Sequence, residues 1–406
     1  MFKSRLVRRI FKVFAILAMV GALGVAALLG SLWLEHRSDV TLPTPTGPLA
    51  VGRAVYDWVD EAAVDALAPV AGTKRELLVW IWYPANPGQS AADDYIPAAL
   101  RGGETRTGST ILRMLSRDLT KVHGHSIANA EVSSQQPTYP VVIMRTGASS
   151  DVVNYSTLAE DLASHGYVVV GFDAPYRTWR VAFPDRRVIE RTPENNPELY
   201  EGQPQAARLN ELLAAWTGDI SFVLDRLERL TAADPAGKLA GRLDMTRVGV
   251  FGHSFGGAQA AQFCHDDARC KAGIDVDGWP LGSVVEAGLH QPFMFLLSDQ
   301  DTSNAEGREV MARIHSVYDR LPADERLLIK IRGANHFTFS DDGALLKSRI
   351  FRGALRLFGK LGIDGRRQLA VTTYCVRSFF DTYFKAGGAS PLELSSPQYP
   401  EIEVLK

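Results

Sequence analysis

This 406-residue sequence has few cysteines, a small net charge and no internal repeats. The spacing of its three cysteines and nine histidines resembles no zinc site, so we expect no metal ion. The formal net charge is −2; the first twelve residues contribute +5, which leaves −7 on the remainder. A mildly acidic body argues against nucleic acid as a partner.

The few cysteines still leave one pairing open. Cys264 and Cys270 are close enough in sequence to form a disulfide if the local geometry allows, and an oxidising compartment would permit it. Cys375 would then stay unpaired. Two small buried thiols are an equally good interpretation. The remaining composition, 46% hydrophobic and 22% charged, is that of an ordinary globular chain.

One long apolar run lies near the amino terminus. Residues 13–34 carry no charge and follow a basic segment, residues 1–12. Twenty-two helical residues at about 1.5 Å each extend roughly 33 Å, which is enough to span a bilayer. The excess of Lys and Arg before the run places that end in the cytoplasm. The pattern predicts an uncleaved signal anchor with the body outside, in the periplasm or extracellular space; the alternative is a secretory signal cleaved near Ala26 or Ala27.

The rest of the chain divides by composition. Residues 35–50 include a Pro/Thr/Gly-rich stretch and are predicted as a linker. Residues 51–390 fit a single α/β domain. Within it, residues 86–137 are polar, rich in Gly and Ser and only patchily periodic, which indicates an insertion over the sheet and a candidate lid. Residues 391–406 are predicted as a tail.

Short apolar runs alternate with helical patterns over much of this domain. Strands that alternate with helices indicate a mostly parallel sheet with helices on both faces and right-handed crossovers. Strands are expected at residues 76–83, 141–144, 167–172, 247–251, 272–276, 293–298 and 327–331. Helices are expected at residues 111–122, 155–164, 205–230, 258–263, 305–318, 344–359 and 367–384.

The most informative motif joins the strand at 247–251 to the helix that follows. It reads Gly252-His253-Ser254-Phe255-Gly256-Gly257. A strand, then Gly-x-Ser-x-Gly, then a helix is the nucleophile elbow of α/β-hydrolases, in which the turn lifts the serine hydroxyl to the carboxyl edge of the sheet. Glycines flank the serine because so sharp a turn leaves no room for side chains. We therefore predict Ser254 as a nucleophile; a glycine-rich turn in another α/β protein is the alternative.

A serine hydroxyl needs an imidazole base, and the base needs a carboxylate to fix its tautomer. In this fold the chain order is Ser, acid, His. His336 lies in a glycine-containing loop after the last predicted strand, where the base should be. The acid has two candidates, Asp277 and Asp301 (or its neighbour Asp299). Both follow predicted strands and precede His336, so the pattern alone does not separate them.

Three motifs resemble the platelet-activating-factor acetylhydrolase family, the plasma and intracellular type II lipases. The elbow is one. The second is Asp277-Gly278-Trp279-Pro280-Leu281-Gly282, which is similar to the family's Asp-x-Trp motif ending in Pro-Leu-Gly. The third is Arg332-Gly333-Ala334-Asn335-His336, which resembles Arg-Gly-x-x-His. The resemblance covers about residues 139–336 and implies Asp277 as the acid.

Two departures from the family pattern concern the substrate pocket. Thr146-Gly147 stands where the family usually has His-Gly, and the stretch after Trp279 is shorter. The oxyanion donors are backbone N–H groups, which by position belong to Ala148 and Phe255.

These features predict a serine ester hydrolase that needs no metal or organic cofactor. The resemblance implies short acyl esters as substrates, including the sn-2 acyl groups of phospholipids, and a membrane anchor would agree with a lipid ester. A general carboxylesterase or polyesterase is the alternative within the same chemistry. A non-catalytic hydrolase-fold protein that binds ligands is the alternative of another class. The oligomeric state is not indicated.

Overall fold

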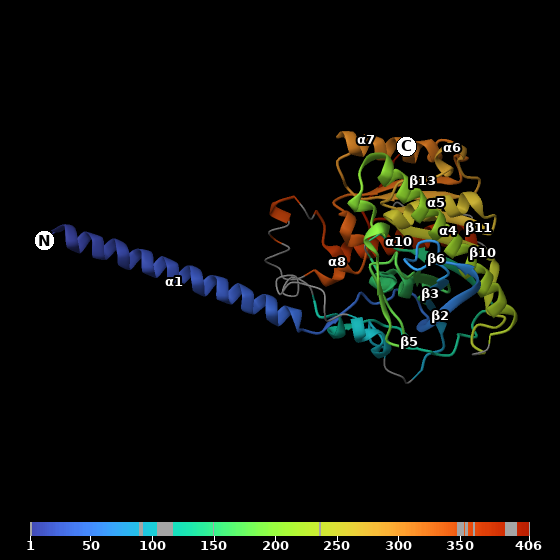
Figure 1. Ribbon diagram of the computed structural model, residues 1–406, viewed down its shortest axis with the longest axis horizontal. Helices are drawn as coiled ribbons and strands as arrows, with labels where there is room; N and C mark the ends of the chain where they lie inside the picture. The colour runs from blue at the N-terminus through green and yellow to red at the C-terminus, as the bar shows by residue number, and fades with distance from the viewer. Residues whose placement is uncertain are drawn as a thin grey trace.

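The computed structural model describes residues 2–88, 92–103, 117–148, 150–234, 237–346, 353, 356–359, 362–385 and 396–405. Figure 1 shows a body built around one twisted sheet and a single long helix that projects away from it. The sheet has ten strands and is mostly parallel, which confirms the expected α/β-hydrolase fold. Much of the expected closing helix at 344–359 lies outside the described residues, as does most of the helix expected at 111–122.

The strand order places the predicted elbow at the centre of the sheet. β10 lies between β6 and β11, and all three run parallel. Antiparallel pairs occur toward the edges, between β7 and β3, β3 and β2, and β13 and β14. From edge to edge the strands are β14 (Ile402–Leu405), β13 (Arg326–Ile331), β12 (Phe293–Leu297), β11 (Cys270–Val276), β10 (Leu243–His253), β6 (Tyr139–Arg145), β7 (Val168–Asp173), β3 (Lys74–Ala85), β2 (Ala50–Val64) and β5 (Ile127–Ala128).

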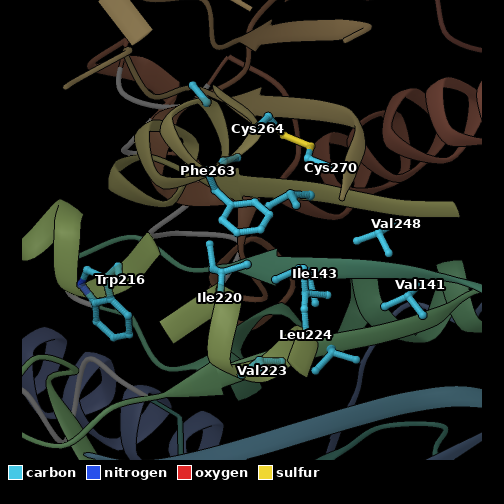
Figure 2. Packing of buried hydrophobic residues seen from close by; sticks show 14 of the residues in the cluster. Val141, Ile143, Trp216, Ile220, Val223, Leu224, Val248, Phe263, Cys264 and Cys270 are labelled. Carbon is cyan, nitrogen blue, oxygen red and sulfur yellow. A yellow bond between two sulfur atoms is a disulfide. The ribbon is translucent and has the colours of Figure 1, made fainter. Parts of the chain in front are cut away.

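Helices cover both faces of the sheet because the central strands are apolar on both. Val141 and Ile143 of β6 belong to one buried cluster, while Val142 and Met144 belong to the other. Figure 2 shows the first cluster. Its helices are α4 (Gly202–Ala232), α5 (Phe255–Asp266), α6 (Val284–Ala287) and α7 (Ala305–Tyr318); the second is covered by α3 (Ser156–Ser164) and α10 (Gly365–Phe384). The short helix α8 (Asp342–Leu345) precedes α10.

Cys264 and Cys270 form a disulfide (Figure 2). Cys264 lies in α5 and Cys270 begins β11, so the bond ties the elbow helix to the next strand, and both sulfur-bearing residues are fully buried. Cys375 is a free, buried thiol in α10, and burial raises its pKa. The sequence left a disulfide and two free buried thiols open as interpretations, and the structure contains the disulfide.

The amino-terminal helix α1 (Phe2–His36) is long, and its apolar part lies within residues 11–36. Residues 11–36 have a mean hydropathy of 2.5 over their most apolar window and bury none of it against the body. The helix has the length and composition of a membrane span or a signal sequence. Together with the disulfide, which is typical of oxidising compartments, it indicates that the body lies outside the cytoplasm.

Segments expected to be loose are held against the body. In the predicted linker, β1 (Val40–Thr41) pairs with β4 (Val122–His123), and Thr46 donates two hydrogen bonds of 2.7 Å to Asp161. β14 comes from the predicted tail and forms an edge of the sheet. A strand of four residues is too short to leave a clear pattern in the sequence.

Candidate active site

Ser254 lies in the turn between β10 and α5. Its backbone has φ 57° and ψ −125°, in the sparsely populated left-handed half of the map. The turn is tight enough that a Cβ atom at Gly252 would overlap the carbonyl group of Gly256. A Cβ at Gly256 would in turn come within 2.6 Å of the carbonyl oxygen of Arg145. The flanking glycines are therefore required by space, and the strain at Ser254 is maintained by the surrounding packing.

The structure brings His336 and Asp277 into line with Ser254. His336 Nε2 lies 3.1 Å from Ser254 Oγ, and His336 Nδ1 lies 2.7 Å from Asp277 Oδ2. Asp277 follows β11, and its carboxyl group is buried. Its second oxygen, Oδ1, accepts a hydrogen bond of 2.7 Å from the backbone N–H of Ser298. Both carboxylate oxygens of Asp277 are thus engaged, and the group is held in one orientation.

The competing acids lie elsewhere. Asp301 is exposed, and its Oδ1 accepts hydrogen bonds of 2.8 Å and 2.6 Å from the N–H and hydroxyl of Ser303. These bonds lower the pKa of the Asp301 carboxyl. Asp299 accepts from Gly333 N–H at 2.7 Å. Asp301 thus supports its own turn, which is a common role for aspartate, while Asp299 binds the turn at Gly333, 34 residues along the chain.

Ala148 and Phe255, the predicted oxyanion donors, line one small cavity beside Ser254. Gly147, which precedes Ala148, is so close to Ser254 that an added Cβ would lie 3.3 Å from the serine Cβ. Phe255 is the first residue of α5, where N–H groups have no carbonyl partner within the helix. In the described part of the chain, Ala148 N–H donates no hydrogen bond to another protein group. Both N–H groups are therefore available to a ligand oxygen.

The cavity has a volume of about 10 Å³, close to the minimum that holds one water molecule. Leu212, Trp216 and Gln259 line it, together with Arg177 and Arg191. A much larger groove of about 1300 Å³ runs between α4, α6 and α7; Trp279 lines it, but Ser254, His336 and Asp277 do not. We take the small cavity as the one that bears on the chemistry because it adjoins the oxyanion loop.

His253 packs against His336 and contacts Tyr155, an arrangement that the sequence did not predict. The ring of His253 lies 4.7 Å from the His336 ring, centroid to centroid. His253 Nδ1 lies 2.8 Å from the hydroxyl of Tyr155, and Gly147 N–H donates to the same hydroxyl at 3.4 Å. Tyr155 therefore joins the loop at Gly147 to His253. His253 belongs to the elbow motif and Tyr155 was expected as the start of a helix, but neither pattern predicts this contact.

Burial lowers the pKa of His253 from 6.5 to about 3, with a further contribution from His336. Between about pH 3 and 6.5, His253 is therefore neutral in the folded protein but protonated in the unfolded chain. Since protons then favour the unfolded state, we expect stability to fall as pH falls from about 6.5 toward 3, by about 1.4 kcal/mol per pH unit. Urea unfolding of wild type and His253→Gln between pH 6.5 and 4.5 tests this. Parallel pH dependences would contradict it.

Among the described residues, no group of three or more His, Cys, Asp and Glu side chains is arranged to hold a metal ion.

A mostly parallel α/β sheet with a strained serine at a central strand-to-helix turn defines the class: this chain is an α/β-hydrolase. Residues 34–177 and 228–385 match the model of platelet-activating factor acetylhydrolase, isoform II. The chain belongs to that family, as the motif resemblance implied, and is an esterase.

Relatives are distant but extend over most of the chain. A protein named as a probable 1-alkyl-2-acetylglycerophosphocholine esterase of Arthroderma benhamiae is 24% identical, over 91% of this chain and 94% of its own. Platelet-activating factor acetylhydrolase of Cavia porcellus is 27% identical, over 83% and 79%. A solved structure of a ferulic acid esterase from Streptomyces cinnamoneus superimposes with a TM-score of 0.73, at 26% identity, over 91% of this chain and all of its own.

Proposed function

We propose that this protein is a serine esterase that cleaves short acyl esters, with sn-2 acyl groups of phospholipids as its natural substrates. The hydrogen-bonded chain from Asp277 through His336 to Ser254 is the observation that supports this most strongly. Two relatives along most of the chain carry names that describe hydrolysis of an acetyl ester on a glycerophosphocholine or platelet-activating factor, which supports the substrate class.

In the proposed mechanism, Ser254 Oγ attacks the ester carbonyl carbon while His336 Nε2 takes the hydroxyl proton. The Asp277 carboxylate holds the imidazole in the tautomer that leaves Nε2 free to accept and stabilises the imidazolium that forms. The N–H groups of Ala148 and Phe255 bind the oxyanion. His336 then donates the proton to the leaving alcohol as the C–O bond breaks. Water repeats the sequence on the acyl-enzyme and releases the acid.

The cavity of about 10 Å³ beside the oxyanion donors supports a short acyl group. It has space for one methyl-sized group, so a longer acyl chain must displace side chains. Each poorly accommodated methylene costs about 1–3 kcal/mol of discrimination. We therefore expect kcat/KM to fall by at least about tenfold from p-nitrophenyl acetate to p-nitrophenyl octanoate. Assays of the acetate, butyrate and octanoate esters measure this.

Leu212 lines this cavity and offers a matched variant. Leu212→Ala should enlarge the space and raise the octanoate-to-acetate ratio of kcat/KM by about tenfold. Leu209→Ala, which lies one helical turn away on α4 and lines the large groove, should leave the ratio unchanged. Equal rates on all three esters in wild type would contradict a size-limited acyl pocket.

A general carboxylesterase is the second candidate. It is favoured by likeness to cutinases, including cutinase 2 of Thermobifida cellulosilytica at 23% identity over 49% of this chain, and by the ferulic acid esterase structure. A 2-acetyl phospholipid assayed beside the nitrophenyl esters separates the two. Preference for the phospholipid supports the acetylhydrolase; turnover of nitrophenyl esters alone supports the general esterase.

For the amino terminus we propose an uncleaved membrane anchor, with residues 13–34 as the span and the basic residues 1–12 in the cytoplasm. The exposed apolar surface of α1 supports this, since no protein surface covers it. A flotation assay with phospholipid vesicles tests this. The full chain should float with the vesicles, whereas a chain beginning at Val40 should not.

A further inference from the structure

The carboxyl end of α1 is capped by the body as well as by Ser38, whose hydroxyl donates to the Glu35 carbonyl oxygen at 3.0 Å. The last carbonyl groups of a helix have no partner within the helix. Here the carbonyl oxygen of Glu35 accepts a hydrogen bond of 3.0 Å from Arg117 Nη1, and that of His36 accepts one of 2.9 Å from Asp118 N–H. The same guanidinium contacts Ser38 Oγ at 3.1 Å. His36 is 8% exposed, so the end of the apolar helix is packed against the body.

Arg117 also contacts α8, the short helix that follows the turn at His336. Its Nε donates a hydrogen bond of 3.0 Å to the carbonyl oxygen of Leu345, the last residue of α8. One guanidinium thus caps the carboxyl ends of both α1 and α8, where a positive charge is favoured. A short 3₁₀ turn, residues 336–339, begins at His336 and is separated from α8 only by Ser340 and Asp341.

Very little chain separates the apolar helix from the body. Residues 37–39 are the whole connection between α1 and β1, and three extended residues reach at most about 11 Å. β1 is held by β4, and Arg366 Nη2 donates to the carbonyl oxygen of Thr41 at 2.6 Å. Leu42 is buried in the core. A helix that spans a bilayer and ends here must therefore place this side of the body at the lipid headgroups.

The surface on that side is partly apolar. Phe337, beside His336, is 73% exposed, and its ring packs edge-on against the His336 ring at 5.4 Å. In Figure 1, α8 lies on the side of the body toward α1, and so does the orange-red segment that includes residues 356–359. Leu357 and Phe358 of that segment are exposed as well. The labels of β10 and β11 lie on the side of the body away from α1 (Figure 1).

From these contacts we infer that the entrance to the active site faces the bilayer, and that Arg117 holds it there by joining the anchor to α8, which follows the turn at His336. This surface comprises Arg117, α8, Phe337 and residues 356–359. Its partner is the lipid bilayer that holds α1. An ester embedded in that bilayer then reaches Ser254 without crossing bulk water. The inference rests on the proposed membrane anchor.

Nitroxide labels on the full chain in phosphatidylcholine vesicles test the orientation. One label is placed at Phe337→Cys. The control is Lys271→Cys, an exposed site near the amino end of β11, at the opposite edge of the sheet from Asp277. Cys375 is buried, and unmodified protein corrects for any labelling of it. Hydrolysis of p-nitrophenyl acetate checks that each variant is folded.

We expect the label at 337 to be shielded from a water-soluble nickel chelate and accessible to oxygen, and the label at 271 to remain accessible to the chelate. Equal chelate access at both sites in vesicle-bound protein would overturn the inference. Failure of the protein to float with vesicles would instead refute the anchor itself, and so separates the two claims.

The variant Arg117→Ala tests whether Arg117 sets the orientation of the body on the bilayer. We expect hydrolysis of the soluble nitrophenyl ester to change less than twofold, while turnover of a 2-acetyl phospholipid in the same vesicles falls about tenfold, the effect expected when charge-assisted hydrogen bonds are lost. Shielding of the label at 337 should weaken in parallel. An unchanged ratio of vesicle to soluble turnover, with shielding retained, would show that Arg117 does not set the orientation. Arg117→Lys, which keeps the charge, should recover part of the ratio.

Discussion

Replacing Ser254 with alanine is expected to lower kcat for ester hydrolysis by about 10⁵- to 10⁶-fold, with KM little changed. We expect the hydroxyl to form the acyl-enzyme because it lies 3.1 Å from His336 Nε2, on a turn that adjoins Gly147. Alanine removes this atom but keeps the strained backbone and the donors of Ala148 and Phe255. The residual rate should come from binding and the oxyanion site alone.

Stopped-flow or discontinuous assays with p-nitrophenyl acetate measure this loss. A fluorophosphonate probe should label the wild type and fail to label Ser254→Ala. Ser150→Ala is the matched control, because Ser150 lines the small cavity beside Ala148 and Phe255, and this variant should stay active and reactive. Retained labelling in Ser254→Ala would point to another nucleophile. A wild type that neither labels nor turns over would favour the ligand-binding alternative.

Changing Asp277 to asparagine should lower kcat by about 10⁴-fold. An amide at this position can donate to His336 Nδ1, which favours the tautomer with its proton on Nε2, and that tautomer cannot take the proton from Ser254. The amide also carries no charge to stabilise the imidazolium. The change is nearly isosteric, so the backbone hydrogen bond from Ser298 to Asp277 Oδ1 can persist and the fold should be kept.

Asp301→Asn is the discriminating control, since Asp301 was the other candidate acid. Its carboxyl group is exposed and engaged with Ser303, so kcat should change less than twofold. Thermal unfolding of both variants confirms that any loss is chemical. The opposite pattern, with Asp301→Asn inactive and Asp277→Asn active, would require an acid loop rearranged from the one in this structure.

Much of the fold could be predicted because its signals are local. The helix at 305–318 has the bounds expected from periodicity, and the central parallel strands are continuous apolar runs buried on both faces. The edges were harder to predict. β2 has fifteen residues with mixed burial, and β14 has four, so neither carries a regular pattern. Their pairing with β3 and β13 depends on contacts remote in sequence.

The candidate site divides in the same way. The nucleophile elbow could be predicted because its strand, glycines and serine are contiguous in sequence. The tight turn at the serine requires small residues on either side of it. The acid could not be predicted from the pattern, since Asp277 and Asp301 both follow strands. Only the resemblance to the family motif favoured Asp277. The folded chain places Asp277 2.7 Å from His336 across 59 residues of sequence. The contact of Tyr155 with His253, and those of Arg117 with α1 and α8, follow from no motif, although His253 itself lies in the elbow.

By itself, the sequence determined the class of fold, the elbow serine, the candidate base and the apolar amino-terminal helix, because each depends on neighbours within a few residues or on composition. Only the tertiary structure decided which carboxylate meets the imidazole, which cysteines pair, how small the cavity beside Ala148 and Phe255 is, and which side of the body the helix adjoins. Those depend on distances between elements, which are set by packing across the sheet and not by any single stretch of chain.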